Sequence, residues 1–420
     1  MTVSHDQTVE CVRRGDELQA LGRLDEALAS YRRAVDLQPG DFVAQLSCGN
    51  LLAKMGQHES ALGYFDNTLQ ISPKNAAVYF NRAGSLQSME RFDEAISCYR
   101  AAISLRPDMG MAHHNLATCF LQTGDFETGF QEYEWRKSSP TFDDPRYALD
   151  RPWNGQDLKG KTLFIYPELY QGDLMQFCRY AFVAERMGAR VRLAAPAAMH
   201  ALLQSMSPTI ELLPEDAIPA YDYQCALMSL PHAFGTTLAT VPRGRAYFRA
   251  EPLRVARWRK LIGPRGFKIG VAWEGSAQAV QRSFPLAGLQ GLAALPGVRL
   301  ISLQKHRGLD QLESLPSGMS VESLGEDFDP GPDAFLDTAA AMTCCDLFIT
   351  PDTSVAHLAG ALRVRTWTAL PQPGDWRWLV DRPDSPWYPT MRLFRQTSPG
   401  DWASVFAQME TALKAELRTR

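Results

Sequence analysis

The chain lacks a surplus of charge, a long apolar run and any block of like charge that would suggest a binding tail. Its 420 residues carry a formal net charge of -4 and have a pI near 6.1, so the overall charge gives no electrostatic case for nucleic acid or an anionic membrane. No apolar stretch approaches the roughly 18 residues that cross a bilayer, and residues 1–10 are polar and acidic. We therefore expect no membrane span, no signal peptide and a cytoplasmic location.

Cysteine motifs are also missing. The sequence has eight cysteines but no Cys-x-x-Cys pair and no Cys/His group at zinc spacing. Most of them lie in apolar periodic segments, so we expect reduced thiols in the core and neither disulfides nor zinc ligands. They are Cys11, Cys48, Cys98, Cys119, Cys178, Cys225, Cys344 and Cys345.

The common phosphate and metal motifs are absent or out of context. None of the 30 glycines takes part in a Gly-x-Gly, which leaves a nicotinamide-dependent oxidoreductase as a remote alternative. Residues 155–162 match the P-loop expression but run into a predicted strand instead of following one, so we interpret the match as coincidence. Asp327 and Asp329 form an Asp-x-Asp pair in a loop, where solvated carboxylates are the simpler interpretation, and we expect no metal.

What the sequence does contain is a repeat of 34 residues over its first 140. Four kinds of position recur every 34 residues: two that hold a small residue, one that holds an aromatic residue and one that holds a proline. They are Gly15, Gly49, Ala83 and Ala117; Ala27, Ala61, Ala95 and Gly129; Tyr31, Phe65, Tyr99 and Tyr133; and Pro39, Pro73 and Pro107. The pattern predicts pairs of helices that approach at the small residue, with the aromatic filling the gap to the next unit and the proline ending the second helix.

This period is similar to that of tetratricopeptide repeat (TPR) arrays. The units are predicted at 8–41, 42–75 and 76–109, with a partial one at 110–140. Such arrays stack into a curved solenoid whose concave face commonly holds a peptide or another protein. Asn50, Asn81, Arg82, His114 and Asn115 are polar helical positions that suit this face, although a solvated repeat surface explains them as well.

After a connector at 141–160, the pattern changes to alternating strands and helices. It predicts two α/β domains at 161–255 and 266–396, separated by a Pro/Arg/Gly-rich passage, and a final helix within 397–420. Ligands of open parallel sheets bind beyond the carboxyl ends of the strands, so we expect the site in a cleft between the two domains. The predicted strands are 162–166, 191–194, 210–213, 225–228, 268–273, 299–303, 347–350 and 366–369, and a helix is predicted over 175–187.

Segment 345–362 is the most informative of the strand-to-helix turns. Asp352, Thr353 and Ser354 are good helix N-caps placed between an apolar strand and an apolar helix. The first turn of a helix presents unpaired N–H groups and a partial positive charge, which suit an anion such as phosphate. With Ser354 as the cap, His357 falls at the third helical position, within reach of the same anion. An ordinary capped helix in which His357 only packs is an equal alternative.

Two further groups of residues are expected at the same edge. Asp173 follows the first strand of the first α/β domain, where a carboxylate can accept the proton of an attacking hydroxyl or amide, although an N-cap aspartate explains it equally well. In the second domain Ser276 and Arg282 follow the first strand, and the arginine either holds a phosphate or is simply solvated. Gln304 and Lys305 follow the next strand, on the base or ribose side of a nucleotide.

In this order the pieces resemble bacterial TPR proteins whose C-terminal half is similar to the heptosyltransferase-like glycosyltransferases. Those enzymes have the GT-B fold, in which two Rossmann-like domains face a cleft. The resemblance covers nearly the whole chain, and Gly172-Asp173 and 352–360 are its most specific elements. The residues that carry it are 170–180, 228–231, 270–273, 301–304, 351–360, 375–378 and 385–388.

The resemblance implies a nucleotide-sugar held by the C-terminal domain, with its diphosphate on the helix 354–362. It implies that Asp173 is the general base, that Gln171 and Gly172 belong to the acceptor loop, and that transfer is inverting. No cofactor or metal is expected, because a helix N-terminus and basic side chains stabilise the leaving diphosphate. The donor-binding residues are then Ser276, Arg282, Gln304, Lys305, Asp352, Thr353, Ser354 and His357.

We therefore predict an α-helical TPR solenoid followed by an α/β GT-B half that transfers a sugar to a protein or glycan acceptor recruited by the repeats. The alternative is a TPR interaction scaffold whose GT-B half is catalytically degenerate. Three departures from the family pattern leave this alternative open. Residues 169–171 lack the usual extra glycine, 274–281 is a shorter loop without the usual His and Asp, and 363–365 replaces Gly-Lys-Pro.

Overall fold

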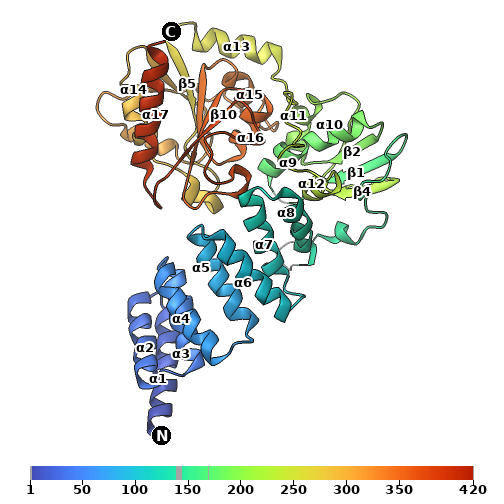
Figure 1. Ribbon diagram of the computed structural model, residues 1–420. Helices are drawn as coiled ribbons and strands as arrows, with labels where there is room; N and C mark the ends of the chain where they lie inside the picture. The colour runs from blue at the N-terminus through green and yellow to red at the C-terminus, as the bar shows by residue number, and fades with distance from the viewer. Residues whose placement is uncertain (1, 139–143, 169, 420) are drawn as a thin grey trace. The chain divides into compact units, whose positions relative to one another are not determined.

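The computed structural model describes residues 2–138, 144–168 and 170–419, and the chain divides into two compact units at Asp143 and Asp144. The two units are coloured from blue to red along the chain in Figure 1. Residues 139–140 of the predicted partial repeat, residues 141–143 of the predicted connector and Leu169 of the departing segment 169–171 lie outside the described residues. Five of the eight cysteines are buried, in line with the prediction of core thiols, whereas Cys11, Cys344 and Cys345 are half-buried.

The first unit is built from successive pairs of antiparallel helices (Figure 1). They are α1 (Thr2–Ala20) with α2 (Leu24–Leu37), α3 (Phe42–Lys54) with α4 (His58–Ile71), α5 (Ala76–Ser88) with α6 (Phe92–Leu105), and α7 (Gly110–Thr123) with α8 (Phe126–Tyr133), followed by the 3-10 turn η1 (Glu134–Ser138). The helices α3, α5 and α7 begin at positions 42, 76 and 110, which is the 34-residue step of the sequence. The predicted helical repeat solenoid is confirmed.

The small and aromatic repeat positions meet inside each unit. A Cβ atom added to Gly15 would lie 2.3 Å from Cε1 of Tyr31, and one added to Gly49 would lie 2.7 Å from Cε1 of Phe65. Tyr31 and Phe65 are buried, with exposed fractions of 2% and 0%. The ring therefore packs over the small residue of its own helix pair, whereas the sequence pattern placed it in the gap to the next unit.

The second unit contains two sheets in which every pairing is parallel. The first sheet has the order β3-β2-β1-β4 and the second β10-β9-β8-β5-β6-β7. The strands are β1 (Thr162–Tyr166), β2 (Arg190–Ala194), β3 (Glu211–Leu213), β4 (Tyr223–Ala226), β5 (Phe267–Val271), β6 (Val298–Ser302), β7 (Val321–Glu322), β8 (Leu347–Pro351), β9 (Thr366–Leu370) and β10 (Met391–Arg395). This confirms an α/β architecture for the C-terminal half.

The helices of the second unit depart from the prediction in two places. The helix expected over 175–187 is broken at Cys178 into two, and the passage expected to separate the domains contains a helix of its own, α13. The short β7 and the final strand β10 were not predicted, so the expectation that the strand series ends at β9 is wrong. The helices are α9 (Gln171–Phe177), α10 (Arg179–Arg186), α11 (His200–Gln204), α12 (Leu230–Ala233), α13 (Pro252–Ile262), α14 (Gln290–Ala293), α15 (Leu336–Met342), α16 (Ser354–Ala361) and α17 (Trp402–Leu417).

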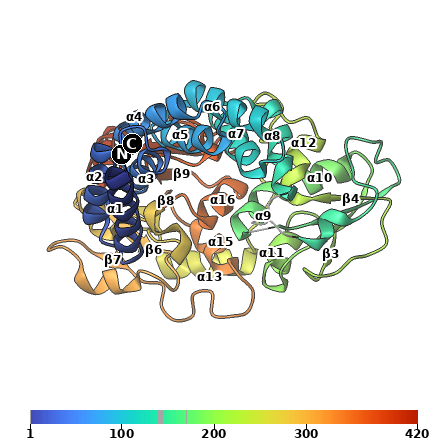
Figure 2. The same ribbon diagram turned by 90° about the horizontal axis from the view of Figure 1, so that it is seen from below.

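Helix α9 follows β1 of the first sheet and helix α16 follows β8 of the second, and the two helices pack side by side (Figure 2). A Cβ atom on Gly172 would lie 3.2 Å from Cδ2 of His357, so the glycine permits this close approach. The buried guanidinium of Arg179 donates to the carbonyl of Trp387 at 2.9 Å and to the hydroxyl of Tyr247 at 3.0 Å. These contacts hold the two sheets together along the carboxyl ends of β1 and β8. Among the described residues, none of the helices has both the length and the apolar character to cross a bilayer.

Candidate functional site

A cavity of about 610 Å³ opens at the carboxyl ends of β5, β6 and β8. This is the edge at which parallel sheets bind ligands. Its lining includes residues from α9, from the loops after β5 and β6, and from the start of α16. Six of the predicted site residues line it: Gln171, Ser276, Gln304, Lys305, Thr353 and Ser354.

The first turn of α16 faces this cavity without a side-chain cap. Thr353 is the N-cap residue, with extended backbone, and its side chain makes no capping hydrogen bond. Ser354 is therefore the first helical residue and not the cap, and His357 lies at the fourth position instead of the third. The uncapped first turn retains N–H groups and partial positive charge for a ligand.

His357 does not reach the cavity. It is 5% exposed, shares a hydrogen bond of 2.9 Å between Nδ1 and the hydroxyl of Tyr388, and stacks on Trp378 with ring centroids 5.5 Å apart. Burial, assisted by the nearby Arg377, lowers the pKa of His357 to about 3. A neutral, packed imidazole is not a cationic phosphate ligand, so this structure favours the packing alternative for His357.

Gln304 braces the loop above the cavity. Its Oε1 accepts from the backbone N–H groups of Trp273 at 2.9 Å and Glu274 at 3.1 Å, and its Nε2 donates to the carbonyls of Glu274 at 2.8 Å and Arg307 at 2.9 Å. Both the oxygen and the nitrogen of the side-chain amide are therefore hydrogen-bonded to the backbone. Gln304 shapes the wall of the cavity and presents no unused donor to a ligand.

Cationic side chains of the β6 loop line the same wall. Lys305 donates from Nζ to the carbonyl of Phe328 at 2.5 Å, and Arg307 donates from Nε to Oε1 of Glu274 at 3.1 Å. Arg307, His306 and Glu274 line the cavity although the sequence analysis did not select them. Nothing in their local pattern distinguishes them from solvated loop residues.

Asp173, Arg282 and Asp352 lie beside the cavity in a chain of ion pairs, outside its lining. Asp352 accepts from Nη1 of Arg282 at 3.0 Å, and Asp173 accepts from Nη2 of Arg377 at 2.5 Å. Asp375 joins the two pairs. Its Oδ1 accepts from Nη1 of Arg377 at 3.0 Å, and its Oδ2 lies 3.6 Å from Nη2 of Arg282. We call these five residues the cleft ion-pair chain.

The three carboxyl groups of the cleft ion-pair chain differ in the direction of their pKa shifts. Burial raises the pKa of Asp173, with Arg377 acting in the opposite direction. Burial and then repulsion by Asp375 raise the pKa of Asp352 to about 6 despite Arg282. Burial also acts upward on the pKa of Asp375, but Arg377 and Arg282 outweigh it, so this pKa is lowered. Asp375 is therefore the most strongly ionised of the three at neutral pH.

Arg377 and Asp375 were not selected from the sequence, although both lie in the segment 375–378 that carries part of the resemblance. Asp375 caps η9 (Trp376–Trp378) by accepting from the N–H of Arg377 at 2.9 Å. The turn lies after β9, about 200 residues from Asp173 along the chain, so no local pattern points to the pair. Arg282 and Asp375 also line a second cavity of about 690 Å³ at the carboxyl ends of β9 and β10.

The Asp327-x-Asp329 pair has separate structural tasks. Asp329 accepts from the N–H groups of Asp337 at 2.6 Å and Thr338 at 3.0 Å, so it fastens the start of α15. Asp327 is exposed and pairs with Arg257 at 3.3 Å. The two carboxylates have different partners, and within the described residues no group of three His, Cys, Asp or Glu side chains is arranged to hold a metal ion.

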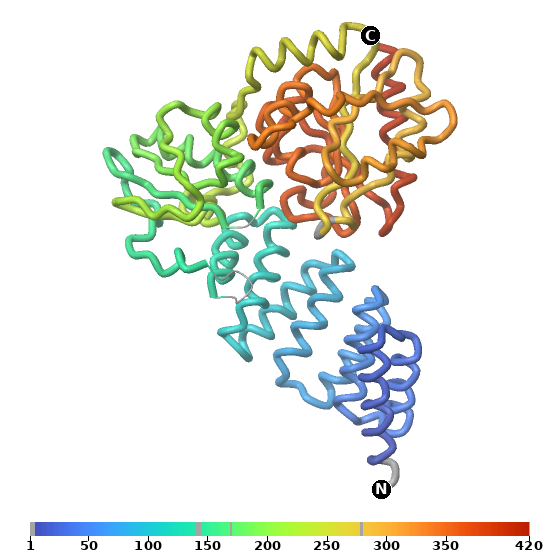
Figure 3. Tube along the Cα trace, turned by 180° about the vertical axis from the view of Figure 1, so that it is seen from behind, coloured from blue at the N-terminus to red at the C-terminus, as the bar shows by residue number. Residues whose placement is uncertain are grey.

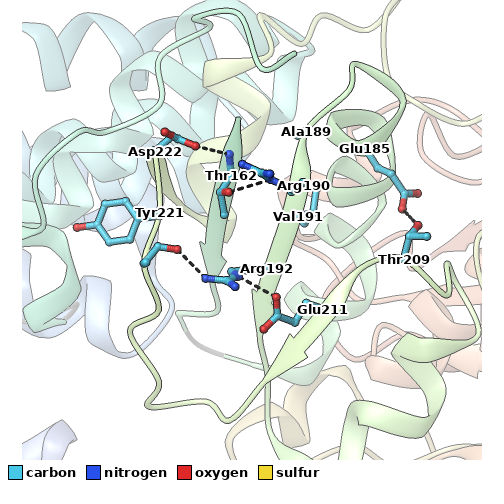
Figure 4. Close-up of a pocket in the computed structure, with 11 residues that line it drawn as sticks. Thr162, Glu185, Ala189, Arg190, Val191, Arg192, Thr209, Glu211, Tyr221 and Asp222 are labelled. Atoms are coloured by element: carbon cyan, nitrogen blue, oxygen red, sulfur yellow. Dashed lines mark hydrogen bonds and ion pairs between the residues drawn. The ribbon is translucent and has the colours of Figure 1, made fainter. Parts of the chain in front are cut away.

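Figure 4 shows a further cavity, of about 620 Å³, at the opposite edge of the first sheet. Thr162 and Arg190, which begin β1 and β2, line it, and Arg192 pairs with Glu211 across it at 2.8 Å. Its other charged side chains bond hydroxyl or backbone groups: Arg190 donates to Oγ1 of Thr162, Glu185 accepts from Thr209, and Asp222 accepts from the N–H of Thr162. Because it lies at the amino ends of the strands, it is a weaker candidate than the cavity at the carboxyl ends.

The first unit has a groove of its own, of about 460 Å³, lined by residues of α3, α4, α5 and α7. Asn50, Asn81 and Asn115 line it, and Asn81 donates to Oδ1 of Asn50 at 2.7 Å. Arg82 instead turns to Asp66 at 2.8 Å, and burial lowers the pKa of His114 to about 4. Three of the five predicted groove residues therefore come together.

Comparison with family models identifies the repeats of the first unit. A TPR repeat model matches residues 15–56, and a tetratricopeptide repeat model matches residues 76–109. The chain contains tetratricopeptide repeats. Arrays of this kind are protein-interaction units, so the repeats indicate a peptide or protein partner.

One relative matches along almost the whole chain. It is protein FlbA of Caulobacter vibrioides, 26% identical over an alignment of 433 positions that covers 94% of this chain and 71% of FlbA. A human protein O-mannosyl-transferase, TMTC1, is 31% identical over an alignment of 133 positions, but this covers only 23% of this chain and 15% of TMTC1. Among solved structures, MamA of Desulfovibrio magneticus RS-1 is 20% identical over 33% of this chain and 78% of that one, with a TM-score of 0.31.

Proposed function

We propose that the chain is a glycosyltransferase of the GT-B type, which transfers a sugar from a nucleotide-sugar to a protein or glycan acceptor bound by the TPR array. The supporting observation is the cavity of about 610 Å³ at the carboxyl ends of β5, β6 and β8. Residues of both α/β parts line it, and the uncapped start of α16 faces it. The name of TMTC1 is in line with sugar transfer, but so small a share of that protein is matched that the proposal rests on the cavity.

The diphosphate of the donor would occupy the cavity at the start of α16. Backbone N–H groups of the first turn and the hydroxyls of Thr353 and Ser354 supply donors there, and Lys305 and Arg307 supply positive charge. These groups stabilise the negative charge that develops on the leaving diphosphate, so the mechanism needs no metal. His357, which does not line the cavity, fixes α16 through its hydrogen bond with Tyr388.

Asp173 would act as the general base of an inverting displacement. The acceptor hydroxyl or amide gives its proton to the carboxylate and attacks the anomeric carbon, while the bond from that carbon to the diphosphate oxygen breaks. Because Oδ1 of Asp173 accepts from Arg377, Oδ2 is the atom for the proton. A raised pKa improves a carboxylate as a base, provided that it stays ionised at the working pH. Inversion rests on the family resemblance alone.

One observation favours the alternative, a TPR scaffold with a degenerate GT-B half. Asp173 is only 8% exposed, lies outside the lining of the cavity, and is already paired with Arg377. As a general base it must meet the acceptor, so the two α/β parts have to separate locally before transfer. In a degenerate protein the same pair would serve only to hold these parts together.

A nucleotide screen tests the proposal first. Thermal unfolding of the full chain with UDP, GDP, ADP and CMP should show one nucleotide that raises Tm, because a ligand at 100 times its Kd stabilises the folded state by about 2.7 kcal/mol. No stabilisation by any of the four favours the scaffold. If one binds, intact-mass analysis of a co-expressed acceptor should show a sugar-sized gain with the wild type and none with Asp173→Asn. Equal modification by that variant would remove Asp173 from the role of base.

A further inference from the structure

The passage 243–265 carries a strong positive charge that the overall balance conceals. It has one acidic residue, Glu251, and eight basic residues, in a chain whose net charge is -4. The passage is internal and not a tail, so it was not among the features that the sequence analysis considered for binding. The basic residues are Arg243, Arg245, Arg249, Arg254, Arg257, Arg259, Lys260 and Arg265.

Helix α13 forms the centre of this passage and runs along the outside of the second unit (Figures 1 and 3). Its inner face is fixed by Trp258 and Ile262, which are 0% and 5% exposed. The indole of Trp258 donates to Oδ1 of Asp337 at 2.8 Å, which anchors the helix to α15. The outward orientation of the opposite face is thereby set.

That outer face exposes leucines as well as cations. Leu253 is 79% exposed and Leu261 is 62% exposed, and no other large apolar side chain of the described residues is as exposed as Leu253. At the helical period, Leu253, Arg257, Lys260 and Leu261 lie within one stripe about 100° wide. We call these four residues the α13 face. The ion pair of Arg257 with Asp327 is exposed on both sides, at 50% and 84%, and so is readily exchanged for another anion.

We propose that the α13 face binds the surface of an anionic lipid bilayer. Leucines that project from a surface helix enter the boundary between head groups and acyl chains, while lysine and arginine stay at the lipid phosphates. Each cation adds to the attraction of an anionic leaflet. Nucleic acid would use the cations and leave both leucines in water, so the leucines favour a membrane. One helix of this length with two leucines gives reversible, peripheral binding.

Vesicle sedimentation of the full chain tests this at low salt. The vesicles are phosphatidylcholine alone, and phosphatidylcholine in which phosphatidylglycerol replaces about a third of the lipid. Wild type should sediment with the anionic vesicles only. Arg257→Gln with Lys260→Gln should weaken partitioning by roughly fivefold for each cation. Leu253→Ser with Leu261→Ser should weaken it by roughly tenfold for each leucine.

The matched controls lie on the repeat unit. Lys74→Gln with Arg106→Gln removes two exposed cations, and Leu21→Ser removes a leucine that is 70% exposed. Both should partition like wild type. The proposal fails if wild type does not prefer anionic vesicles, or if the α13 variants partition like wild type. Equal loss in the controls would also overturn it. A shift of a DNA duplex that depends on Arg257 and Lys260, without vesicle binding, would assign the face to nucleic acid instead.

Discussion

The guanidinium of Arg377 and the carboxylate of Asp173 meet at 2.5 Å, with only 12% and 10% of the two side chains exposed. Arg377 stands in the turn after β9 and Asp173 on α9, so the pair joins the two α/β parts. Arg377 also donates from Nε to Oε1 of Gln176 at 2.9 Å, a second contact to α9. A single guanidinium therefore controls both the charge beside the proposed base and the contact between the two sheets.

Replacing Arg377 by glutamine should strongly destabilise the folded chain. The change leaves the buried Asp173 without its cation and Asp375 with only Arg282, whose Nη2 lies 3.6 Å away, and removing one partner of a buried pair costs about 3–5 kcal/mol. Thermal unfolding at neutral pH measures the loss. The control is Arg192→Gln, which breaks the pair with Glu211 at 31% and 51% exposure and should cost less than about 1 kcal/mol. Equal losses in the two variants would contradict a special role for Arg377.

The deficit of Arg377→Gln should also narrow as the pH falls. Without the cation, the folded-state pKa values of both carboxyl groups move up, so the folded variant binds protons at a pH where the unfolded chain does not. Stability from such groups is present at low pH and is lost as the pH rises. The difference in Tm between wild type and variant, measured from neutral pH down to about pH 5, checks the sign. A deficit that widens on acidification would show that the carboxylates are not involved.

His357 provides a second pH prediction, from a group whose pKa is lowered in the folded state. Its folded-state pKa of about 3 lies below the ordinary value of 6.5, so below that value the unfolded chain takes up a proton that the folded chain does not. Wild type should therefore lose stability relative to His357→Gln as the pH falls through this window, at up to about 1.4 kcal/mol per pH unit. The pH profiles of both proteins measure this, and His232→Gln, on an exposed position, is the control. Parallel wild-type and His357→Gln profiles would show that His357 is not buried as a neutral ring.

Local sequence patterns anticipated the parts of this protein that local physics determines. The repeat was predictable because Gly49 and Phe65 recur with their equivalents at a fixed step, and each helix pair packs on its neighbours. Strand β1 was predicted with its bounds because an apolar run between a connector and a helix has few other solutions. The order β10-β9-β8-β5 depends on long connections that leave no such local mark.

The candidate site was predictable to the level of loops but not of contacts. The carboxyl ends of β5, β6 and β8 bring Ser276, Lys305 and Thr353 to one cavity, as the pattern of strands indicated. The role of Arg377 was not accessible, because its contact with Asp173 depends on how the two sheets pack. The orientation of His357 was not accessible either, because it depends on the packing of α16 against Tyr388 and Trp378, which are distant in the sequence.

Thr353→Asp should separate ligand binding from helix stability. Aspartate is a good N-cap, and Thr353 makes no capping bond of its own, so the variant should fold as well as wild type or better, by about 0.5–2 kcal/mol. The new carboxylate stands where the diphosphate would bind and repels it. The nucleotide that raises Tm of the wild type should therefore have little effect on Thr353→Asp and a normal effect on Thr353→Ser. An undiminished shift in the aspartate variant would place the anion elsewhere.

The two glycines Gly49 and Gly63 should respond in opposite directions to the same change. A Cβ on Gly49 meets the fully buried ring of Phe65 at 2.7 Å, so Gly49→Ala forces the ring or the helix to shift, at a cost of about 1–3 kcal/mol. Gly63 is exposed inside α4 with nothing within 4 Å of the added atom, so Gly63→Ala should stabilise by up to about 1 kcal/mol through helix propensity. Thermal unfolding of the full chain compares the variants, and hydrogen exchange of α3 and α4 assigns the change to the repeats. If both variants were stabilised, the ring of Phe65 would not be seated over Gly49, and the account of the 34-residue step as a small residue packed under an aromatic one would fail.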